Sequence, residues 1–422
     1  MFKESLLDKT LHRIKRLIPK SVFNFFAPYY HAGLAHLGSV YYGNPSKSLK
    51  VIGVTGTKGK STTVYLISKI FESVDIPMAA IGSLGFKIKN KEWPNTLKMT
   101  MPGRFKLQKF FYEAKKAGCK YVALEVTSEG IKQKRHLGIN FDCAVFTNLH
   151  KEHLESHGSF ENYYRSKQEL FAQTSNVHVL NADEKNVELF SKFSSKRTIF
   201  YGIENGDMKA RNLELRPDGA SFEVYGTRFN INFGGRFNVL NCLAALSVSA
   251  MYGIDLPRIK PILESINNIP GRMEFVQKEP FGVVVDYAHT PDSLEMVYKT
   301  LKKDSRKLIC VLGAAGGGRD KWKRPEFGRI ADEYCDEIIL TDEDPYDETP
   351  EKIINEVASG IKSDRQVIKI LDRKEAIKTA LNSAGEGDVV VITGKGSEIS
   401  MAISCERKIP WSDKQIVLEL LK

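Results

Sequence analysis

The 422-residue sequence has few cysteines, and their positions exclude two classes of stapled fold. Six cysteines lie at positions 119, 143, 242, 310, 335 and 405, with no paired spacing. This pattern gives neither a zinc ribbon nor a disulfide framework, so we expect reduced thiols in a cytoplasmic protein. The sequence also lacks a helix-turn-helix signature and the aromatic-basic motif of RNA-binding modules, so we expect no nucleic-acid partner.

The chain also lacks a convincing signal-peptide cleavage site, although its N-terminus is basic and then apolar. A segment rich in Phe, Tyr and Leu, residues 22–42, follows the basic residues Lys9, Arg13, Lys15, Arg16 and Lys20. Two interpretations of residues 1–47 stay open. One is a pair of helices packed on the first domain, and the other is a peripheral anchor on an anionic membrane.

The formal net charge of +11 is compatible with several anionic partners, and a glycine-rich loop favours a small anionic substrate among them. The stretch VIGVTGTKGKSTT, residues 51–63, begins as a β-branched strand and continues into a segment with apolar residues at helical spacing. Gly56 and Gly59 allow backbone N–H groups to approach a polyphosphate at a helix N-terminus. Lys60 would neutralise the outer phosphates and Ser61 would ligate Mg²⁺. Val54 stands where the strict phosphate-loop pattern has glycine.

Polar residues follow the next predicted strands of the first half of the chain. Residues 121–126 and 143–147 read as buried strands, and Glu125 is an acid inside an apolar run. Alternation with helices predicts a parallel sheet, whose ligands bind beyond the carboxyl ends of its strands. Glu125, Asn148 and His153 fall at that edge, together with the phosphate loop. Residues 198–233 read as an antiparallel excursion.

Strand-helix alternation resumes after a linker at residues 267–271 and predicts a second doubly wound domain. The fold class is therefore α/β, with a central phosphate-loop ATPase domain followed by a Rossmann-like C-terminal domain. We place the boundaries at 1–47 for a short helical segment, 48–270 for the central domain and 271–422 for the C-terminal domain. The glycines at 313, 316 and 318 have the wrong spacing for a dinucleotide fingerprint.

Several motifs taken together resemble the Mur ligase family, and most of all its tripeptide synthetases. They are GTKGKST, the strand ending at Glu125, the asparagine-histidine segment, DYAHTP and GGGRDKWKRP, and the similarity runs from about residue 48 to the C-terminus. The resemblance implies an ATP-dependent ligase that adds an amino acid to the carboxylate of a muramoyl-dipeptide through an acyl phosphate. Such an enzyme acts in peptidoglycan precursor synthesis and so in cell shape and division.

The resemblance also implies roles for residues of the central domain. The catalytic set is Lys60, Glu125, His153 and Lys167. Of two magnesium ions, Ser61 and Glu125 would hold one, and His153 and Lys167 the other. Because an ammonium group does not ligate a cation, Lys167 would be carbamylated, as in the family. The implied ATP-binding residues are Gly56, Thr57, Lys58, Gly59, Lys60, Ser61, Thr62, Asn238, Asn241, Arg272, Asp286 and His289.

The implied substrate contacts lie in both domains. Those for the muramoyl-dipeptide are Thr100, Ser128, Gln133 and Arg135. Arg324 would bind the carboxylate of the incoming amino acid, and the other implied contacts are Asp342, Asp344, Gly394 and Glu398. The resemblance implies a monomer.

The chain departs from the family in three places. Asp344, Pro345 and Tyr346 stand where diaminopimelate-adding members carry asparagine, proline and arginine, so Asp344 and Glu398 could pair with the side-chain amine of lysine or ornithine, and diaminopimelate stays open. Ser397 replaces a common histidine. Residues 1–47 replace the uridine-nucleotide-binding domain, so the carrier of the acceptor is open. The alternative functions are a folylpolyglutamate-type or other peptide ligase, or an ATP-binding regulatory module without catalysis.

Overall fold

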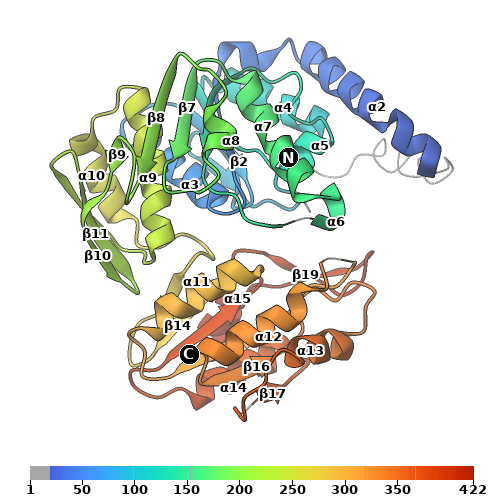
Figure 1. Ribbon diagram of the computed structural model, residues 1–422, viewed down its shortest axis with the longest axis vertical. Helices are drawn as coiled ribbons and strands as arrows, with labels where there is room; N and C mark the ends of the chain where they lie inside the picture. The colour runs from blue at the N-terminus through green and yellow to red at the C-terminus, as the bar shows by residue number, and fades with distance from the viewer. Residues whose placement is uncertain (1–19, 98, 153, 319, 366) are drawn as a thin grey trace.

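The computed structural model describes residues 20–422 except 98, 153, 319 and 366, and it contains two α/β bodies (Figure 1). The N-terminal body comprises residues 50–265 and the C-terminal body residues 274–420. The predicted α/β fold class is confirmed, because each body is built on a mainly parallel sheet covered by helices on both faces.

The N-terminal body contains a nine-stranded sheet in the order β4-β3-β2-β5-β1-β6-β7-β8-β9. The strands β2, β5, β1, β6, β7, β8 and β9 are parallel to one another. The strands β3 and β4 form an antiparallel edge. The strands are β1 Lys50–Thr55, β2 Met78–Gly82, β3 Gly85–Ile88, β4 Lys91–Trp93, β5 Tyr121–Glu125, β6 Phe141–Phe146, β7 Val177–Asn181, β8 Arg197–Gly202 and β9 Met208–Lys209.

Helices cover both faces of this sheet, which is why its central strands are apolar on both sides. One face packs against α3 Lys60–Ser73, α9 Arg236–Met251 and α10 Leu256–Ser265. The other face packs against α4 Arg104–Lys116, α5 Ser128–Lys132, α7 Phe160–Gln173 and α8 Glu188–Ser191. The short helix α6, Leu154–His157, precedes α7.

The predicted antiparallel excursion begins later than the sequence suggested, so the boundary at residue 198 was wrong. Strands β8 and β9 continue the parallel sheet, and a separate antiparallel sheet contains only β10 Arg211–Arg216, β11 Gly219–Val224 and β12 Thr227–Ile231. Strand β8 lies near the sheet edge and is half-exposed. Its mixed polarity therefore resembles that of an antiparallel strand.

The C-terminal body has a six-stranded sheet in the order β13-β14-β18-β15-β16-β17, in which only β13 is antiparallel. Helices α11, α12 and α13 pack on one face, and α14 and α15 on the other. The strands are β13 Glu274–Gln277, β14 Gly282–Asp286, β15 Leu308–Leu312, β16 Glu337–Leu340, β17 Val367–Lys369 and β18 Val389–Thr393, with a hairpin of β19 Ser400–Ala402 and β20 Lys408–Pro410. The helices are α11 Pro291–Lys302, α12 Lys323–Tyr334, α13 Pro350–Ala358, α14 Arg373–Ser383 and α15 Asp413–Leu420.

The segment before the sheets contains α2, Lys20–Tyr41, and the 3₁₀ helix η1, Pro45–Ser48. Helix α2 packs against α4, with Tyr41 beside Phe105 and Tyr42 beside Tyr112. The Ser39 hydroxyl donates to the Gly138 carbonyl at 2.9 Å. The first part of the predicted helix pair, residues 1–19, lies outside the described residues. No described helix combines the length and apolarity that crossing a membrane requires.

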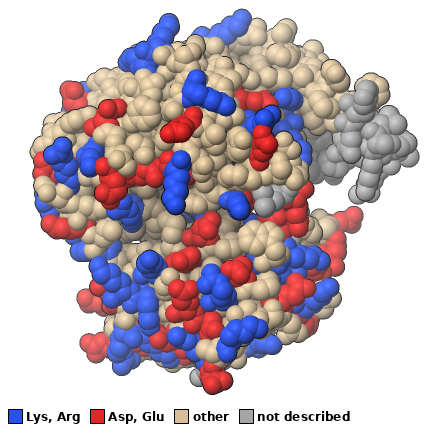
Figure 2. All heavy atoms as spheres, viewed as in Figure 1, with Lys and Arg blue, Asp and Glu red and all other residues tan. Residues whose placement is uncertain are grey.

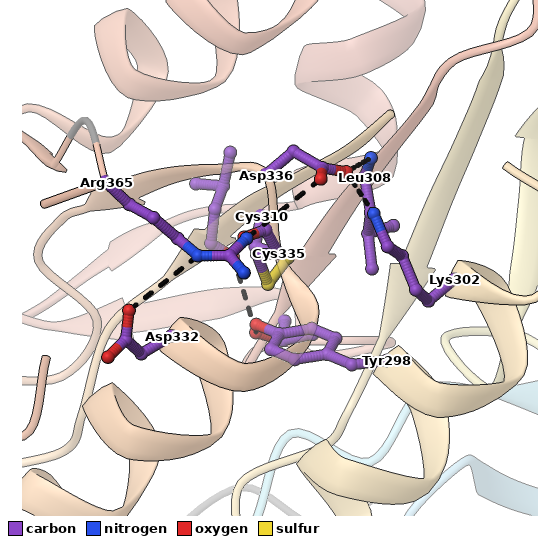
Figure 3. Close-up of a disulfide and its surroundings, with 10 residues drawn as sticks. Tyr298, Lys302, Leu308, Cys310, Asp332, Cys335, Asp336 and Arg365 are labelled. Atoms are coloured by element: carbon purple, nitrogen blue, oxygen red, sulfur yellow. Dashed lines mark hydrogen bonds and ion pairs between the residues drawn. A yellow bond between two sulfur atoms is a disulfide. The ribbon is translucent and has the colours of Figure 1, made fainter. Parts of the chain in front are cut away.

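The expectation that all cysteines are reduced was wrong for one pair. Cys310 in β15 and Cys335 after α12 form a disulfide, shown in Figure 3. The two residues are separated by 25 positions in sequence, and β15 pairs with the strand that follows Cys335. The sheet register therefore brings them together, which the linear spacing of cysteines does not show. Cys119, Cys143 and Cys242 are free and buried, and Cys405 is free and exposed.

A buried ion pair ties together the strand ends of the C-terminal body. The Arg373 guanidinium donates to both carboxylate oxygens of Asp413, at 2.9 and 2.8 Å, and neither side chain is exposed. It also donates to the carbonyls of Thr393, at the end of β18, and of Asp342, after β16. This one side chain therefore fixes the two loops that follow β16 and β18.

Removing this guanidinium is predicted to destabilise the protein strongly. In Arg373→Ala the Asp413 carboxylate stays buried without its cation, so we expect the free energy of unfolding to fall by about 3–5 kcal/mol. Arg329→Ala is the matched control, because Arg329 forms exposed ion pairs on α12 and its loss should cost less than about 1 kcal/mol. Urea unfolding followed by circular dichroism gives both values, and equal losses in the two variants would contradict this role.

Candidate active site

A cavity of about 1210 Å³ lies between the two bodies and contains most of the predicted site residues. The phosphate loop, the ends of β5 and β6, and the loops after β14, β15, β16 and β18 line it. The predicted residues that line it are Thr57, Lys58, Gly59, Lys60, Ser61, Thr62, Thr100, Glu125, Ser128, Gln133, Arg135, Lys167, Asn241, Arg272, Asp286, His289, Arg324, Asp344, Gly394 and Glu398. Gly56, Asn238 and Asp342 do not line it, and His153 lies outside the described residues.

The phosphate loop has the geometry that its glycines predicted. Gly59 precedes α3 with a φ of 81°, and a Cβ atom there would lie 2.3 Å from Oδ1 of Asn241. Both the left-handed backbone and the close approach require glycine. Asn148 holds the loop from the end of β6: it accepts from the Lys58 N–H at 2.8 Å and donates to the Lys58 carbonyl at 3.1 Å. The backbone of the loop is therefore fixed before any ligand binds.

Two lysines, the partly buried Lys60 and the buried Lys167, meet at this loop. The Lys60 ammonium donates to the carbonyls of Gly56 and Thr57, both at 2.8 Å, and Lys167 on α7 donates to the same Gly56 carbonyl at 2.8 Å. Burial lowers the pKa of both groups, that of Lys167 well below its usual value, and the neighbouring charge of Lys60 adds to the effect at Lys167. The described residues place no carboxylate within ion-pair distance of the Lys167 nitrogen. Burial and the charge of Lys60 therefore both disfavour the protonated form of Lys167.

Two buried carboxylates face these lysines. Glu125, at the end of β5, accepts the Ser83 N–H at 2.6 Å; burial raises its pKa and Lys60 opposes that effect. Glu152 lies 3.8 Å from both the His289 ring and the Lys323 ammonium. The sequence analysis did not select Glu152 or Lys323, although Glu152 lies in the same HKEH segment as His153. Carboxylate and hydroxyl oxygens are the ligands that Mg²⁺ prefers, so Glu125 and Ser61 fit such an ion.

The described residues contain no cluster of three His, Cys, Asp or Glu side chains that could hold a metal ion. As a free amine Lys167 is a poor magnesium ligand, whereas Glu125 and Ser61 offer the oxygen atoms that this ion prefers.

A buried arginine dominates the end of the cavity next to α4 and α5. Arg135 donates to the carbonyl of Met101 and, at 2.8 Å, to the side-chain oxygen of Gln133. Ser83 and Thr100 share a hydrogen bond of 2.9 Å between their hydroxyls. We call this the acceptor end, because the predicted peptide contacts Thr100, Ser128, Gln133 and Arg135 all lie here.

Residues of both bodies meet across the cavity. The Arg272 guanidinium lies over the Tyr287 ring at 4.5 Å and donates to the Ser61 hydroxyl at 3.3 Å. Lys58 lies 3.6 Å from Asp292 of α11. The Asp286 carboxylate accepts the N–H groups of Met273 and Ala288, at 2.6 and 2.7 Å, which fixes the first loop of the C-terminal body.

Two further predicted residues have different surroundings. Burial lowers the pKa of His289 to about 4, which favours a neutral ring in the unliganded protein. Asn238 is buried outside the cavity, where its amide donates to the Gly234 carbonyl at 2.7 Å and its oxygen accepts from Asn241 at 3.3 Å. Asn238 therefore orients Asn241, which does reach the cavity.

The opposite end of the cavity, which we call the amino-acid end, contains an ion cluster centred on Lys395. The Lys395 ammonium is buried, lies 3.0 Å from each carboxylate oxygen of Asp344, and also contacts Glu398. Lys395 was not selected from the sequence, although it lies in the GKGSE loop. Because two carboxylates share one lysine, the cluster keeps an excess of negative charge.

Arg324, which is predicted to bind a carboxylate of the substrate, pairs with two acids of the protein in the unliganded structure. Its terminal nitrogens are held by Glu348, at 3.0 and 3.1 Å, and by Glu356, at 2.6 Å. These two acids of the protein occupy the bidentate face of the guanidinium. Only its buried Nε lacks a hydrogen-bond partner.

Comparison with known proteins shows similarity to one protein family over most of the chain. A family model described as Mur ligase middle domain matches residues 54–249, and one described as Mur ligase, glutamate ligase domain matches residues 271–396. A UDP-N-acetylmuramoyl-L-alanyl-D-glutamate–2,6-diaminopimelate ligase of Clostridium acetobutylicum is 38% identical over 398 residues, which cover 92% of this chain and 81% of the relative.

Two solved structures are similar over most of their length. One, a UDP-N-acetylmuramoyl-L-alanyl-D-glutamate–2,6-diaminopimelate ligase, has a TM-score of 0.65 and 31% identity, with 93% of this chain and 82% of that chain covered. The folylpolyglutamate synthase of Mycobacterium tuberculosis has a TM-score of 0.71 and 17% identity, with 86% and 92% covered. The second likeness is one of fold alone.

Glu343, beside the amino-acid end, is predicted to make stability depend on pH. Burial raises the pKa of this carboxyl to about 7, and its ordinary value is 4.5. Between these values the folded state keeps a proton that the unfolded state has lost. The free energy of unfolding should therefore fall as pH rises through this window, by roughly 3 kcal/mol at most.

Glu343→Gln removes this titration, so its stability should be flatter with pH and should exceed that of the wild type at about pH 8. Urea unfolding at a series of pH values between about 5 and 8 measures the difference. Glu326→Gln, at a half-exposed position on α12, is the control and should keep the wild-type slope. If the two variants show the same slope, Glu343 is not the group responsible.

Proposed function

This chain belongs to the Mur ligase family, and we propose that it joins an amino acid to a muramoyl-dipeptide in the cavity between its two bodies. The family assignment makes it an ATP-dependent ligase of peptidoglycan precursor synthesis, as the resemblance predicted. The observation that supports the site is one continuous cavity, which contains the phosphate loop, an arginine-lined acceptor end and an acidic amino-acid end. The family uses ATP and Mg²⁺.

The division of labour that we propose follows the predicted boundaries. Residues 48–270 bind ATP and the acceptor, residues 271–422 bind the amino acid, and residues 1–47 are an additional segment. We also propose that the protein acts as a monomer.

The proposed reaction has two steps, and in each the residues hold reactants and exclude water. An oxygen of the acceptor carboxylate attacks the γ-phosphorus of ATP, ADP leaves, and an acyl phosphate forms. The amine nitrogen of the amino acid then attacks the acyl carbon, phosphate leaves, and the nitrogen gives up a proton. Lys60 and the loop N–H groups would hold the transferred phosphoryl group, and Arg272 would close over it. Closure of the two bodies would protect the acyl phosphate from hydrolysis.

We propose that Lys167 acts as its carbamate. A buried amine with a strongly lowered pKa is nucleophilic at neutral pH, and its nitrogen would add to CO₂ with loss of a proton. The product is a carboxylate, opposite Lys60 and close to the Gly56 carbonyl. It would hold one of two magnesium ions together with His153, while Ser61 and Glu125 hold the other. These ions would neutralise the charge of the phosphates.

We propose that the incoming amino acid carries a side-chain ammonium and no second carboxylate, as lysine and ornithine do. Its ammonium would meet the excess negative charge of Asp344 and Glu398. The relatives described above are named for 2,6-diaminopimelate, which has a second carboxylate. Among the described residues that line the amino-acid end, Arg324 is already engaged by Glu348 and Glu356, so a second carboxylate would lack a free guanidinium. Tyr346 stands where a diaminopimelate enzyme has arginine.

Lys167→Ala is predicted to lower ligation at least a hundredfold, because the variant lacks the carboxylate that the metal requires. A small carboxylate such as acetate should restore part of the activity. Lys167→Met preserves the side-chain volume and tests whether loss of activity reflects folding, and Arg165→Ala, exposed on the same helix, is the matched control.

Carbon-13 NMR of the wild type in labelled bicarbonate should show a carbamate signal that Lys167→Met lacks. Full activity in either Lys167 variant, or the same spectrum in wild type and variant, would contradict the role of the carbamate.

Amino-acid selectivity is predicted to favour lysine or ornithine over meso-diaminopimelate by at least tenfold in kcat/KM, which corresponds to about 1.4 kcal/mol. The assay measures phosphate release in the presence of ATP, muramoyl-dipeptide acceptor and each amino acid. Tyr346→Arg supplies a guanidinium and should shift the ratio toward diaminopimelate. A wild-type preference for diaminopimelate would overturn the proposed selectivity, and no release with any of the three would overturn the proposed function.

A further inference from the structure

Helix α2 presents a stripe of exposed apolar side chains, which a surface helix ordinarily avoids. Tyr29 is 75% exposed, Leu37 58%, Val40 65% and Tyr41 74%. With Phe26 and Tyr30, which are also exposed, they recur at helical spacing along one side of the helix. Ala35, Gly38 and Ser39, on the opposite side, are buried against the N-terminal body. We call the six exposed residues the α2 stripe.

The charged residues that flank this stripe in the sequence are nearly all basic. The sequence contains no Asp or Glu between Asp8 and Glu72, and no charged residue of either sign from 21 to 46. The Lys and Arg residues on either side of that uncharged segment are Lys9, Arg13, Lys15, Arg16 and Lys20 before it, and Lys47 and Lys50 after it. Figure 2 shows the contrast, because the upper part of the molecule is largely tan, whereas blue and red spheres alternate over the C-terminal body.

We propose that the α2 stripe, together with the basic residues that flank it in the sequence, docks the protein on the surface of an anionic lipid bilayer. Apolar and aromatic side chains on one side of a helix insert into the interface between headgroups and acyl chains, and tyrosine is favoured there. Basic residues beside the helix add attraction to anionic headgroups. Since no described helix can span a membrane, the protein would lie on the surface.

A second copy of the chain fits the same surface less well. Pairing two α2 stripes would bring together two acid-free basic segments, which repel each other, whereas an anionic surface attracts each of them. The charge pattern therefore favours lipid over self-association.

Docking through α2 would place the bilayer near the cavity, because α2 contacts residues that lead to its acceptor end. Gly38 of α2 packs on Phe105 in the first turn of α4, and the preceding residue, Arg104, donates to the carbonyl of Gln133 at the acceptor end. Figure 1 shows α2 along the outer edge of the N-terminal body, away from the C-terminal body. The bilayer would therefore lie beside the acceptor end and leave the C-terminal body free to move.

The test measures sedimentation of the full-length protein with vesicles of phosphatidylcholine, with and without one third phosphatidylglycerol. We expect binding to the anionic vesicles that weakens at least tenfold when the salt concentration rises from about 0.1 M to about 0.5 M. The variant Y29S/L37S/Y41S should reduce binding at least tenfold, and K9Q/R13Q/K15Q/R16Q by roughly six hundredfold, at about fivefold for each of the four charges. Both variants should keep the wild-type rate of ligation in solution.

Matched controls carry the same changes elsewhere. L371S/L418S removes exposed apolar side chains of the C-terminal body, and K278Q/K299Q/K374Q/K378Q removes the same number of basic side chains. Both should bind vesicles as the wild type does. The proposal is overturned if the wild type does not sediment with anionic vesicles or if controls and stripe variants lose binding equally. It is also overturned if light scattering shows a dimer that Y29S/L37S/Y41S abolishes while vesicle binding stays unchanged.

Discussion

The site depends on two lysine side chains, one buried and one partly buried, that converge on one carbonyl oxygen. Lys60 and Lys167 both donate to the Gly56 oxygen at 2.8 Å, and burial lowers the pKa of each. Two like charges in such a place are costly, and the cost falls when one of them becomes neutral or when anions arrive. A triphosphate beside Lys60 and a carbamate on Lys167 both reduce it. The local electrostatics therefore already favour the ligands that a family member needs.

The two bodies contribute groups of opposite charge to the cavity. The N-terminal body contributes the cations of the phosphate loop and Arg135 at the acceptor end, whereas the C-terminal body contributes the acidic cluster of Asp344 and Glu398 around Lys395. Arg272 and Asp286 lie where the bodies meet, and Arg272 reaches Ser61 of the phosphate loop. An acyl phosphate formed on one side would thus meet an amine held on the other, in a cavity bounded by both bodies.

The sequence predicted the features that depend on local pattern, and it missed those that depend on register. The phosphate loop, Glu125 at a strand end and the second doubly wound sheet follow from β-branched runs, glycines and alternation with helices. Lys395 and Glu152 were missed because a charged residue next to a motif looks like an ordinary surface residue until the fold buries it. The Cys310–Cys335 disulfide and the true start of the antiparallel sheet were missed because both follow from strand pairing. The engagement of Arg324 by Glu348 and Glu356 depends on helix packing, which spacing does not show.

The central claim is that the acceptor carboxylate is phosphorylated before the amine attacks. The most direct measurement uses a muramoyl-dipeptide whose reacting carboxylate is labelled with oxygen-18, followed by mass spectrometry of the phosphate released during ligation. If the carboxylate receives the phosphoryl group, each phosphate released carries one labelled oxygen from the acceptor. Phosphate without label, formed while the amide accumulates, would show that the phosphoryl group was never transferred to the acceptor.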